Sequence, residues 1–237
     1  MWGSALWPVT LECGDVGLRP IRYRDRAEWT RLRARNARWM APWEASNPLP
    51  GGELPSYRAM VGSLNRQARE DSALPFVITE RGDSLHHPPA IVGQLTVSTI
   101  VWGSARMATL GYWVDEAHAG RGIAPTAVAL ATDHCFRGLG LHRMEINIKP
   151  ENRASLRVVE KLGFRDEGLR ERYLHIAGEW ADHRSFALTA EEVPEGLLNR
   201  WQSRRCAWVV SGRFSHRAPF FCTGRRHTGT NAPRRVY

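Results

Sequence analysis

Hydrophobic and polar residues alternate along several short stretches of this chain, and elsewhere apolar residues recur with the spacing of a helix. The strand-like stretches predict strands at residues 16–23, 75–80, 90–101, 107–114 and 141–149, and a final strand after residue 183. The helical spacing predicts helices at residues 25–39, 56–71, 123–134 and 152–162. A chain of 237 residues suits one domain with an appendage.

The segment from Gly111 to Pro125 carries the clearest functional signal, because a strand there runs through a glycine-bearing turn into a helix. Gly120 and Gly122 let the backbone approach a ligand closely, and the unpaired amides and dipole of a helix N-terminus favour a pyrophosphate. Arg121 adds a positive charge. The sequence has no Gly-Lys-Ser/Thr after these glycines, as a P-loop requires, and no Gly-x-Gly-x-x-Gly after a strand. A third kind of phosphate loop is therefore indicated.

A second segment, residues 141–164, reads as another strand followed by a helix. Residues 141–149 alternate between an apolar face and a polar face that includes Glu145. Asn152 then suits a helix N-cap with Ser155 at the third helical position, and Gly163 suits the left-handed position that ends the helix.

Together these two segments resemble the Gcn5-related N-acetyltransferase (GNAT) superfamily. Its acetyl-CoA loop, Gln/Arg-x-x-Gly-x-Gly/Ala, is matched by Ala-Gly-Arg-Gly-Ile-Ala at residues 119–124, with alanine at the first position. Since Ala119 lacks a side chain that often supports the loop, pyrophosphate binding is expected to rest on Arg121 and on the backbone amides of residues 120–126. The run from Asn152 to Arg170 matches the second CoA-binding segment at its usual distance from the first.

Two further runs look most like the ribosomal-protein N-terminal acetyltransferases of the RimJ/RimL branch. These runs are Leu-His-Arg at residues 141–143 and Gly-Glu-Trp-Ala-Asp-His at residues 178–183. The resemblance covers residues 14–193, which leaves residues 1–13 as an N-terminal extension and residues 194–237 as a C-terminal tail.

The resemblance implies an α/β GNAT fold, a mixed and mostly antiparallel twisted sheet flanked by helices. The strand ending at Val114 and the strand starting near His142 are expected to be parallel and to splay apart, admitting the pantetheine arm of acetyl-CoA. No metal is expected. The residues expected to contact the cosubstrate are Tyr112, Trp113, Val114, Gly120, Arg121, Gly122, Ile123, Ala124, Pro125, Thr126, Asn152 and Ser155.

Direct transfer needs a neutral amine, a hydrogen-bond donor to the carbonyl oxygen and an acid for the leaving thiolate. The resemblance implies a backbone N–H near Val114 as the donor. Ser155 is a candidate acid or simply a helix-start hydroxyl, and Tyr173 is an alternative acid or a packing residue. Glu145 is a candidate base beside the cleft, against the alternative of an exposed strand residue.

The acceptor amine is interpreted as a protein N-terminus. An α-amino group, with a pKa of about 8, is neutral far more often at pH 7 than a lysine at about 10.4. Trp39, Trp43, Glu145 and Trp180 are expected to line a peptide groove, although the tryptophans at 39 and 43 are equally candidates for core anchors. A ribosomal protein is the acceptor that the resemblance suggests. Two alternatives stay open, a small-molecule amine and a CoA-binding or ribosome-associated module without turnover.

The net charge of +9 belongs to the tail, since residues 194–237 hold nine arginines and one acid. This leaves 24 basic and 23 acidic residues in the rest of the chain. The tail is interpreted in three ways: an arm making weak contact with ribosomal RNA, a disordered or irregular extension, or the product of a shifted reading frame. Monomer and homodimer both remain open.

The remaining composition suits an ordinary enzyme of the cytoplasm. There is no run of eighteen apolar residues for a membrane span and no secretory signal pattern at the N-terminus. The four cysteines form no CxxC pair, and His86 and His87 stand in a loop without an acid or cysteine cluster, so no metal site is predicted.

Overall fold

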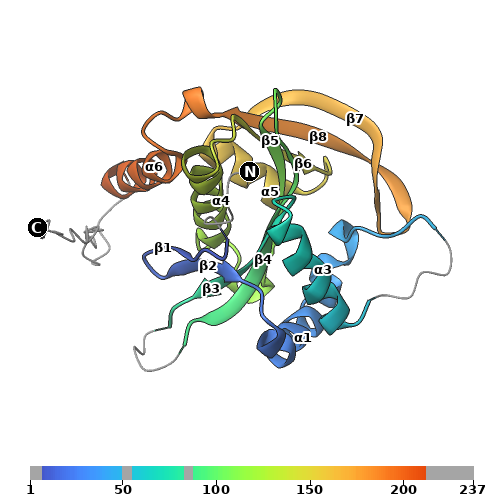
Figure 1. The fold of residues 1–237 in the computed structure, drawn as a ribbon. Helices are drawn as coiled ribbons and strands as arrows, with labels where there is room; N and C mark the ends of the chain where they lie inside the picture. Colours follow the sequence, from blue (N-terminus) through green and yellow to red (C-terminus); the bar gives the residue numbers. More distant parts are fainter. Residues whose placement is uncertain (1–6, 50–54, 83–87, 212–237) are drawn as a thin grey trace, which may run out of the picture.

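The computed structural model of the protein describes residues 7–49, 55–82 and 88–211 and forms one eight-stranded sheet (Figure 1). The strand order is β1-β2-β3-β4-β5-β6-β8-β7. Only β5 and β6 pair in parallel, and the other neighbours are antiparallel. The expected mixed, mostly antiparallel sheet is confirmed. The strands are β1 Leu11–Cys13, β2 Val16–Pro20, β3 Leu74–Glu80, β4 Ala90–Val101, β5 Met107–Val114, β6 Arg143–Ile148, β7 Arg165–Ile176 and β8 Glu179–Thr189.

Helices cover both faces of this sheet (Figure 1). The helices are α1 Arg26–Arg35, α2 Ala37–Met40, α3 Tyr57–Arg69, α4 Ile123–Asp133, α5 Arg153–Leu162 and α6 Leu197–Ser211. One hydrophobic layer joins the sheet to α4, α5 and α6, and a second joins it to α1 and α3. Successive residues of β3 therefore enter different layers, Phe76 and Ile78 the first and Val77 the second. This explains why β3 is apolar at every position up to Ile78.

Most predicted elements agree with the structure, and the differences have local causes. The bounds of β4 and β5 are those expected from the alternation. The predicted helix at 25–39 is divided at Asn36, whose side chain donates to the carbonyl of Leu32 and to Asp115. Asp25, the first residue of that predicted helix, precedes α1 without capping it, and its carboxylate pairs with Arg19 at 2.7 Å.

The beginning of the C-terminal tail is helical, which corrects the expectation of irregular chain from residue 194. Helix α6 packs against α4 (Figure 1), with Leu197 and Trp201 buried between them. The carboxylate of Asp133, at the end of α4, accepts hydrogen bonds from the amides of Leu197 at 2.7 Å and Leu198 at 3.0 Å. The cap of this helix thus comes from a residue far away in the sequence, where no local pattern reveals it.

Some predictions lie outside the described residues. These include the histidine pair at 86 and 87 and residues 212–237, the larger part of the arginine-rich tail at 194–237 to which the RNA-binding interpretation applied. Within the described chain, no helix has the length and apolar character needed to cross a membrane, and no group of three metal-ligating side chains comes together.

Candidate active site

The parallel strands β5 and β6 diverge, as expected from the sequence. They pair only at Met107–Arg143, Ala108–Met144 and Thr109–Glu145. Beyond these pairs β5 continues with β4 as far as Val114, and β6 continues with β8 as far as Ile148. Each strand keeps its other partner, so the two separate from one another without either losing its place in the sheet.

The turn before α4 has the backbone conformation expected of a phosphate loop. Gly120 has φ of 78° and Gly122, the N-cap residue, has φ of 86°, both in the left-handed region. A Cβ added at Gly120 would meet nothing within 4 Å, so the backbone conformation itself favours glycine there. Pro125 has no N–H and the amide of Thr126 donates to the Gly122 carbonyl, which narrows the expected amide donors from residues 120–126 to residues 120–124.

Two side chains of the loop have protein partners. Arg121, about half exposed, pairs with Glu80 on β3 at 2.9 Å. The buried hydroxyl of Thr126 donates to the Gly122 carbonyl at 2.8 Å and accepts from the indole N–H of Trp201 at 2.9 Å. Thr126, which the sequence suggested as a cosubstrate contact, therefore supports the loop from inside the protein, and α6 is part of that support.

Tyr112 and Ser155 meet across the divergence of β5 and β6. Tyr112 lies on β5 beyond the last paired residue, and Ser155 lies in the first turn of α5, directly after β6. Their hydroxyl oxygens are 2.8 Å apart. Asn152 caps α5 as predicted, accepting from the Ser155 amide at 3.0 Å, so the position of Ser155 is fixed at two points. Burial raises the pKa of Tyr112, and the hydrogen bond with Ser155 opposes this only in part.

Glu145 is buried rather than an exposed strand residue. Arg143 donates to one of its carboxylate oxygens at 2.8 Å, and Arg170 donates to the other at 3.3 Å. Arg143 also pairs with Glu167, and Glu167 pairs with Arg165, which extends the network of alternating charges along the sheet. The neighbouring guanidinium groups hold the pKa of Glu167 at about 2. Glu145 thus lies at the closed end of the divergence with both oxygens engaged.

Two acceptor segments, residues 39–44 and residues 178–183, carry the tryptophans expected to line the peptide groove, and they lie side by side. Ala45 forms a β-bridge with Ile176, and the Ser46 hydroxyl contacts His175 and the Gly178 amide, each at 2.9 Å. These contacts tie the chain after α2 to the tip of the β7–β8 hairpin. Of the tryptophans named from the sequence, Trp39 and Trp43 are half-buried and Trp180 is 56% exposed.

Trp39 has a defined link to the site, because its indole N–H donates to the carbonyl of Val114 at 3.3 Å. It therefore reaches the end of β5, near the expected backbone donor. Trp180 lies edge-on against His175, with the ring centroids 5.4 Å apart. The contacts of Trp39 and Trp180 join the acceptor segments to β5 and to the hairpin.

The Tyr173 ring packs against the Arg170 guanidinium and edge-on against His183. In the described part of the chain, no hydrogen bond joins Tyr173 to Ser155. His183 is 3% exposed, and its Nδ1 donates to the Ala181 carbonyl at 2.9 Å. Burial lowers the pKa of this imidazole. The sequence pattern gave His183 no role of its own, because the final strand was expected only after residue 183. The strand β8 in fact begins at Glu179, and alternation along it puts His183 on the same face as the polar residues of β6.

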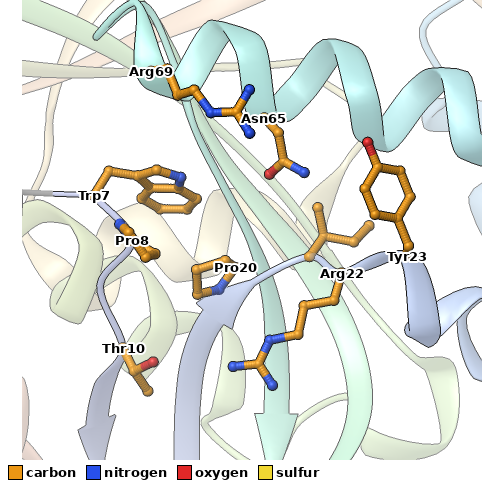
Figure 2. A pocket seen from close by; sticks show the side chains of 9 residues that line it. Trp7, Pro8, Thr10, Pro20, Arg22, Tyr23, Asn65 and Arg69 are labelled. Carbon is orange, nitrogen blue, oxygen red and sulfur yellow. The ribbon is translucent and has the colours of Figure 1, made fainter. Parts of the chain in front are cut away.

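A cavity of about 490 Å³ lies elsewhere, between the chain before β1, the end of β2 and α3 (Figure 2). Its wall includes Trp7, Arg22, Asn65 and Arg69, and it shares no lining residue with the divergence of β5 and β6. No sequence pattern indicated this cavity, because its walls come from three separate segments.

Comparison with known proteins relates this geometry to acetyltransferases. Residues 15–165 match the acetyltransferase (GNAT) domain family. The chain is 29% identical over 173 residues to the probable N-acetyltransferase YjcK of Bacillus subtilis, covering 73% of this chain and 93% of that one. It is also 29% identical over 192 residues to the [ribosomal protein uS5]-alanine N-acetyltransferase of Escherichia coli, covering 79% of this chain and 94% of the relative.

Among solved structures, Mycobacterium smegmatis RimJ in complex with CoA-disulfide superposes with a TM-score of 0.76 at 38% identity, covering 84% of this chain and 96% of that one. The ribosomal-protein-S5-alanine acetyltransferase of Vibrio fischeri gives a TM-score of 0.66 at 26% identity, with coverage of 76% and 96%.

Proposed function

Because this chain belongs to the GNAT acetyltransferase family and is an N-acetyltransferase of its RimJ/RimL-like branch, we propose that it transfers the acetyl group of acetyl-CoA directly to a protein N-terminal amine. The observation that carries the proposal is the pair formed by the glycine turn before α4 and the divergence of β5 from β6. The turn supplies unpaired amides for a pyrophosphate, and the divergence provides a path for the pantetheine arm.

In the proposed complex, the amides of residues 120–124 and the N-terminal dipole of α4 hold the pyrophosphate. Arg121 exchanges its partner Glu80 for a phosphate oxygen. Two structural relatives are bound to CoA species, RimJ of Mycobacterium smegmatis and a RimL enzyme in complex with coenzyme A, which supports this cosubstrate.

The thioester carbonyl is proposed to lie near Val114, where a backbone N–H donates to its oxygen as negative charge develops. Ser155 then protonates the departing sulfur. The hydrogen bond with Tyr112 orients the Ser155 hydroxyl, and the raised pKa of Tyr112 keeps the phenol protonated over the working range. Since both oxygens of Glu145 accept from arginines, we assign it to holding Arg143 and Arg170 in place rather than to removing the proton of the amine.

The acceptor is proposed to enter between the chain around Trp39 and the β7–β8 hairpin, where the two acceptor segments meet. The uS5-alanine N-acetyltransferase among the relatives supports an N-terminal amine of a ribosomal protein. The lower pKa of an α-amine, relative to lysine, favours the same class of acceptor.

Thiol release from acetyl-CoA tests this proposal directly. The acceptors are peptides with free N-termini, including those of ribosomal proteins, lysine peptides blocked at the N-terminus, and small amines. Turnover confined to free N-termini is the expected result. Turnover with small amines alone would contradict the proposed acceptor. Calorimetric binding of CoA without turnover of any acceptor would favour the module without catalysis.

A further inference from the structure

We propose that His183 is the base that takes the proton of the acceptor amine. The proposal rests on the proposed function, because it assigns a role within the same transfer reaction. It depends on the place of His183 in the sheet, the fixed direction of its ring and the groups that surround it.

His183 lies next to the open end of the divergence. Its neighbour Arg184 pairs with Ile148, the last residue of β6, so His183 stands one residue beyond the end of that strand. Side chains alternate along β8, which puts His183 on the same face as Ser185. Ser185 in turn donates to Asn147 of β6 at 2.7 Å. This polar face continues along β6 to Glu145.

The ring of His183 is held as one tautomer. A carbonyl oxygen only accepts hydrogen bonds, so the 2.9 Å contact with Ala181 requires a proton on Nδ1. In the neutral ring Nε2 then carries the lone pair, and within the described residues no hydrogen bond engages Nε2. The ring is therefore ready to accept one proton at Nε2.

The surroundings keep the ring neutral. Burial is the largest cause of its lowered pKa, and Lys149 acts in the same direction, while the hydrogen bond to the Ala181 carbonyl and the charges of Asp182 and Glu151 oppose them. From β7, Arg170 stands opposite His183, and Tyr173 lies edge-on against the imidazole at 6.1 Å between centroids. Because the pKa of His183 lies below the ordinary value of 6.5, the neutral ring, which is the basic form, predominates at neutral pH.

An irregularity in β7 brings Tyr173 over His183. Between the pairs Arg170–His183 and Leu174–Ala181, β7 has two residues more than β8. Arg172, within the bulge, has φ of 47°, and its amide donates to Asp182 at 2.8 Å. Since His183 is 3% exposed and Tyr173 packs edge-on against it, the proton reaches Nε2 through one bound water molecule, an arrangement that general bases commonly use.

In the proposed transfer, an N–H bond of the acceptor ammonium breaks, and its proton passes through the water to Nε2 of His183. The freed nitrogen lone pair forms the C–N bond with the thioester carbonyl carbon, and the C–S bond then breaks. A second proton from the nitrogen replaces the one that Ser155 gives to the sulfur, and the imidazolium returns its proton to solvent.

Two acceptor peptides distinguish this role from a structural one. One has a natural α-amine, and the other begins with an aminooxyacetyl group, whose amine is already neutral at pH 7. His183→Gln should lower kcat for the natural peptide by about 100-fold, within the range of general-base catalysis. For the aminooxy peptide, the loss of kcat caused by His183→Gln should be at least about ten-fold smaller, because that acceptor needs no first deprotonation. His142→Gln changes an exposed histidine that directly precedes β6, and this control should keep full activity.

Thermal unfolding and CoA binding check that the His183→Gln variant is folded, and His183→Asn takes its place if it is not. The wild-type enzyme provides an independent measurement. Its kcat for the natural peptide at saturation should stay constant down to pH 6.5 and fall only at lower pH, where the lowered pKa of His183 is reached, and its kcat for the aminooxy peptide should not fall. Equal defects on both acceptors, or equal pH profiles, would overturn the role of His183. A wild-type protein that acetylates neither peptide would instead overturn the proposed function.

Discussion

The hydroxyl oxygens of Tyr112 and Ser155 are 2.8 Å apart, joining β5 to the first turn of α5 across the point where the sheet opens. Neither residue identifies the other in the sequence, since 43 positions separate them. In this pair the protonated phenol of Tyr112 contacts the Ser155 hydroxyl, which we propose as the proton donor to the leaving sulfur. The pair also connects β5 to the helix that follows β6, on the side where the backbone hydrogen bonds between the two strands have ended.

The first prediction concerns this pair. Ser155→Ala should lower kcat by about 100-fold, since it removes the acid, and Tyr112→Phe should lower kcat by about ten-fold, since it removes only the orienting hydrogen bond. Steady-state thiol release measures both. Ser63→Ala, a helical hydroxyl on α3, is the matched control and should be unaffected. A Ser155→Ala enzyme with wild-type kcat would remove Ser155 from the mechanism.

The second prediction concerns the phosphate loop. Gly122→Ala forces a residue with a Cβ into a backbone with φ of 86°, a conformation that costs about 1–2 kcal/mol. Displacement of the loop amides should weaken CoA binding by at least about ten-fold, as measured by calorimetry. Gly14→Ala has a comparable φ of 57° with nothing within 4 Å of the added Cβ. That control should lose stability without losing CoA affinity.

The third prediction concerns the support of the loop by α6. Trp201→Ala should lower the free energy of unfolding by about 3–5 kcal/mol, because the buried indole leaves a cavity. Trp201→Phe keeps most of the packing and loses the hydrogen bond to Thr126, so it should cost about 1 kcal/mol. Urea unfolding measures both values. Trp102→Ala, 41% exposed between β4 and β5, should change stability far less, and an equal loss there would argue against a specific role of α6.

The fourth prediction concerns pH. The pKa of Glu167 is lowered from 4.5 to about 2 by Arg143 and Arg165, so its stabilising effect is present above pH 4.5 and is lost as the pH falls towards 2. Because the network is partly exposed, the effect is on the order of 1 kcal/mol. Glu167→Gln should therefore be less stable at pH 7 and approach the wild type at low pH in urea unfolding. Glu171→Gln, on the same strand, should follow the wild-type curve throughout.

The sequence by itself determined the parts of this protein that depend on neighbouring residues. Gly120 and Gly122 predicted the left-handed turn, Asn152 predicted a helix cap, and Gly163 predicted the helix end, where φ is 79°. Alternation predicted the bounds of β4 and β5. In each case a local preference of the backbone, or one face of a strand, is enough to determine the conformation.

Tertiary structure alone decided which distant groups meet. The divergence of β5 and β6 follows from each strand keeping its outer partner. Glu145 became a buried partner of Arg143 and Arg170 because β7 returns beside β8. The sequence did not predict helix α6, because both its cap and its packing partner come from α4. Such contacts depend on the energy of packing and ion pairing between remote segments, which no short window of sequence contains.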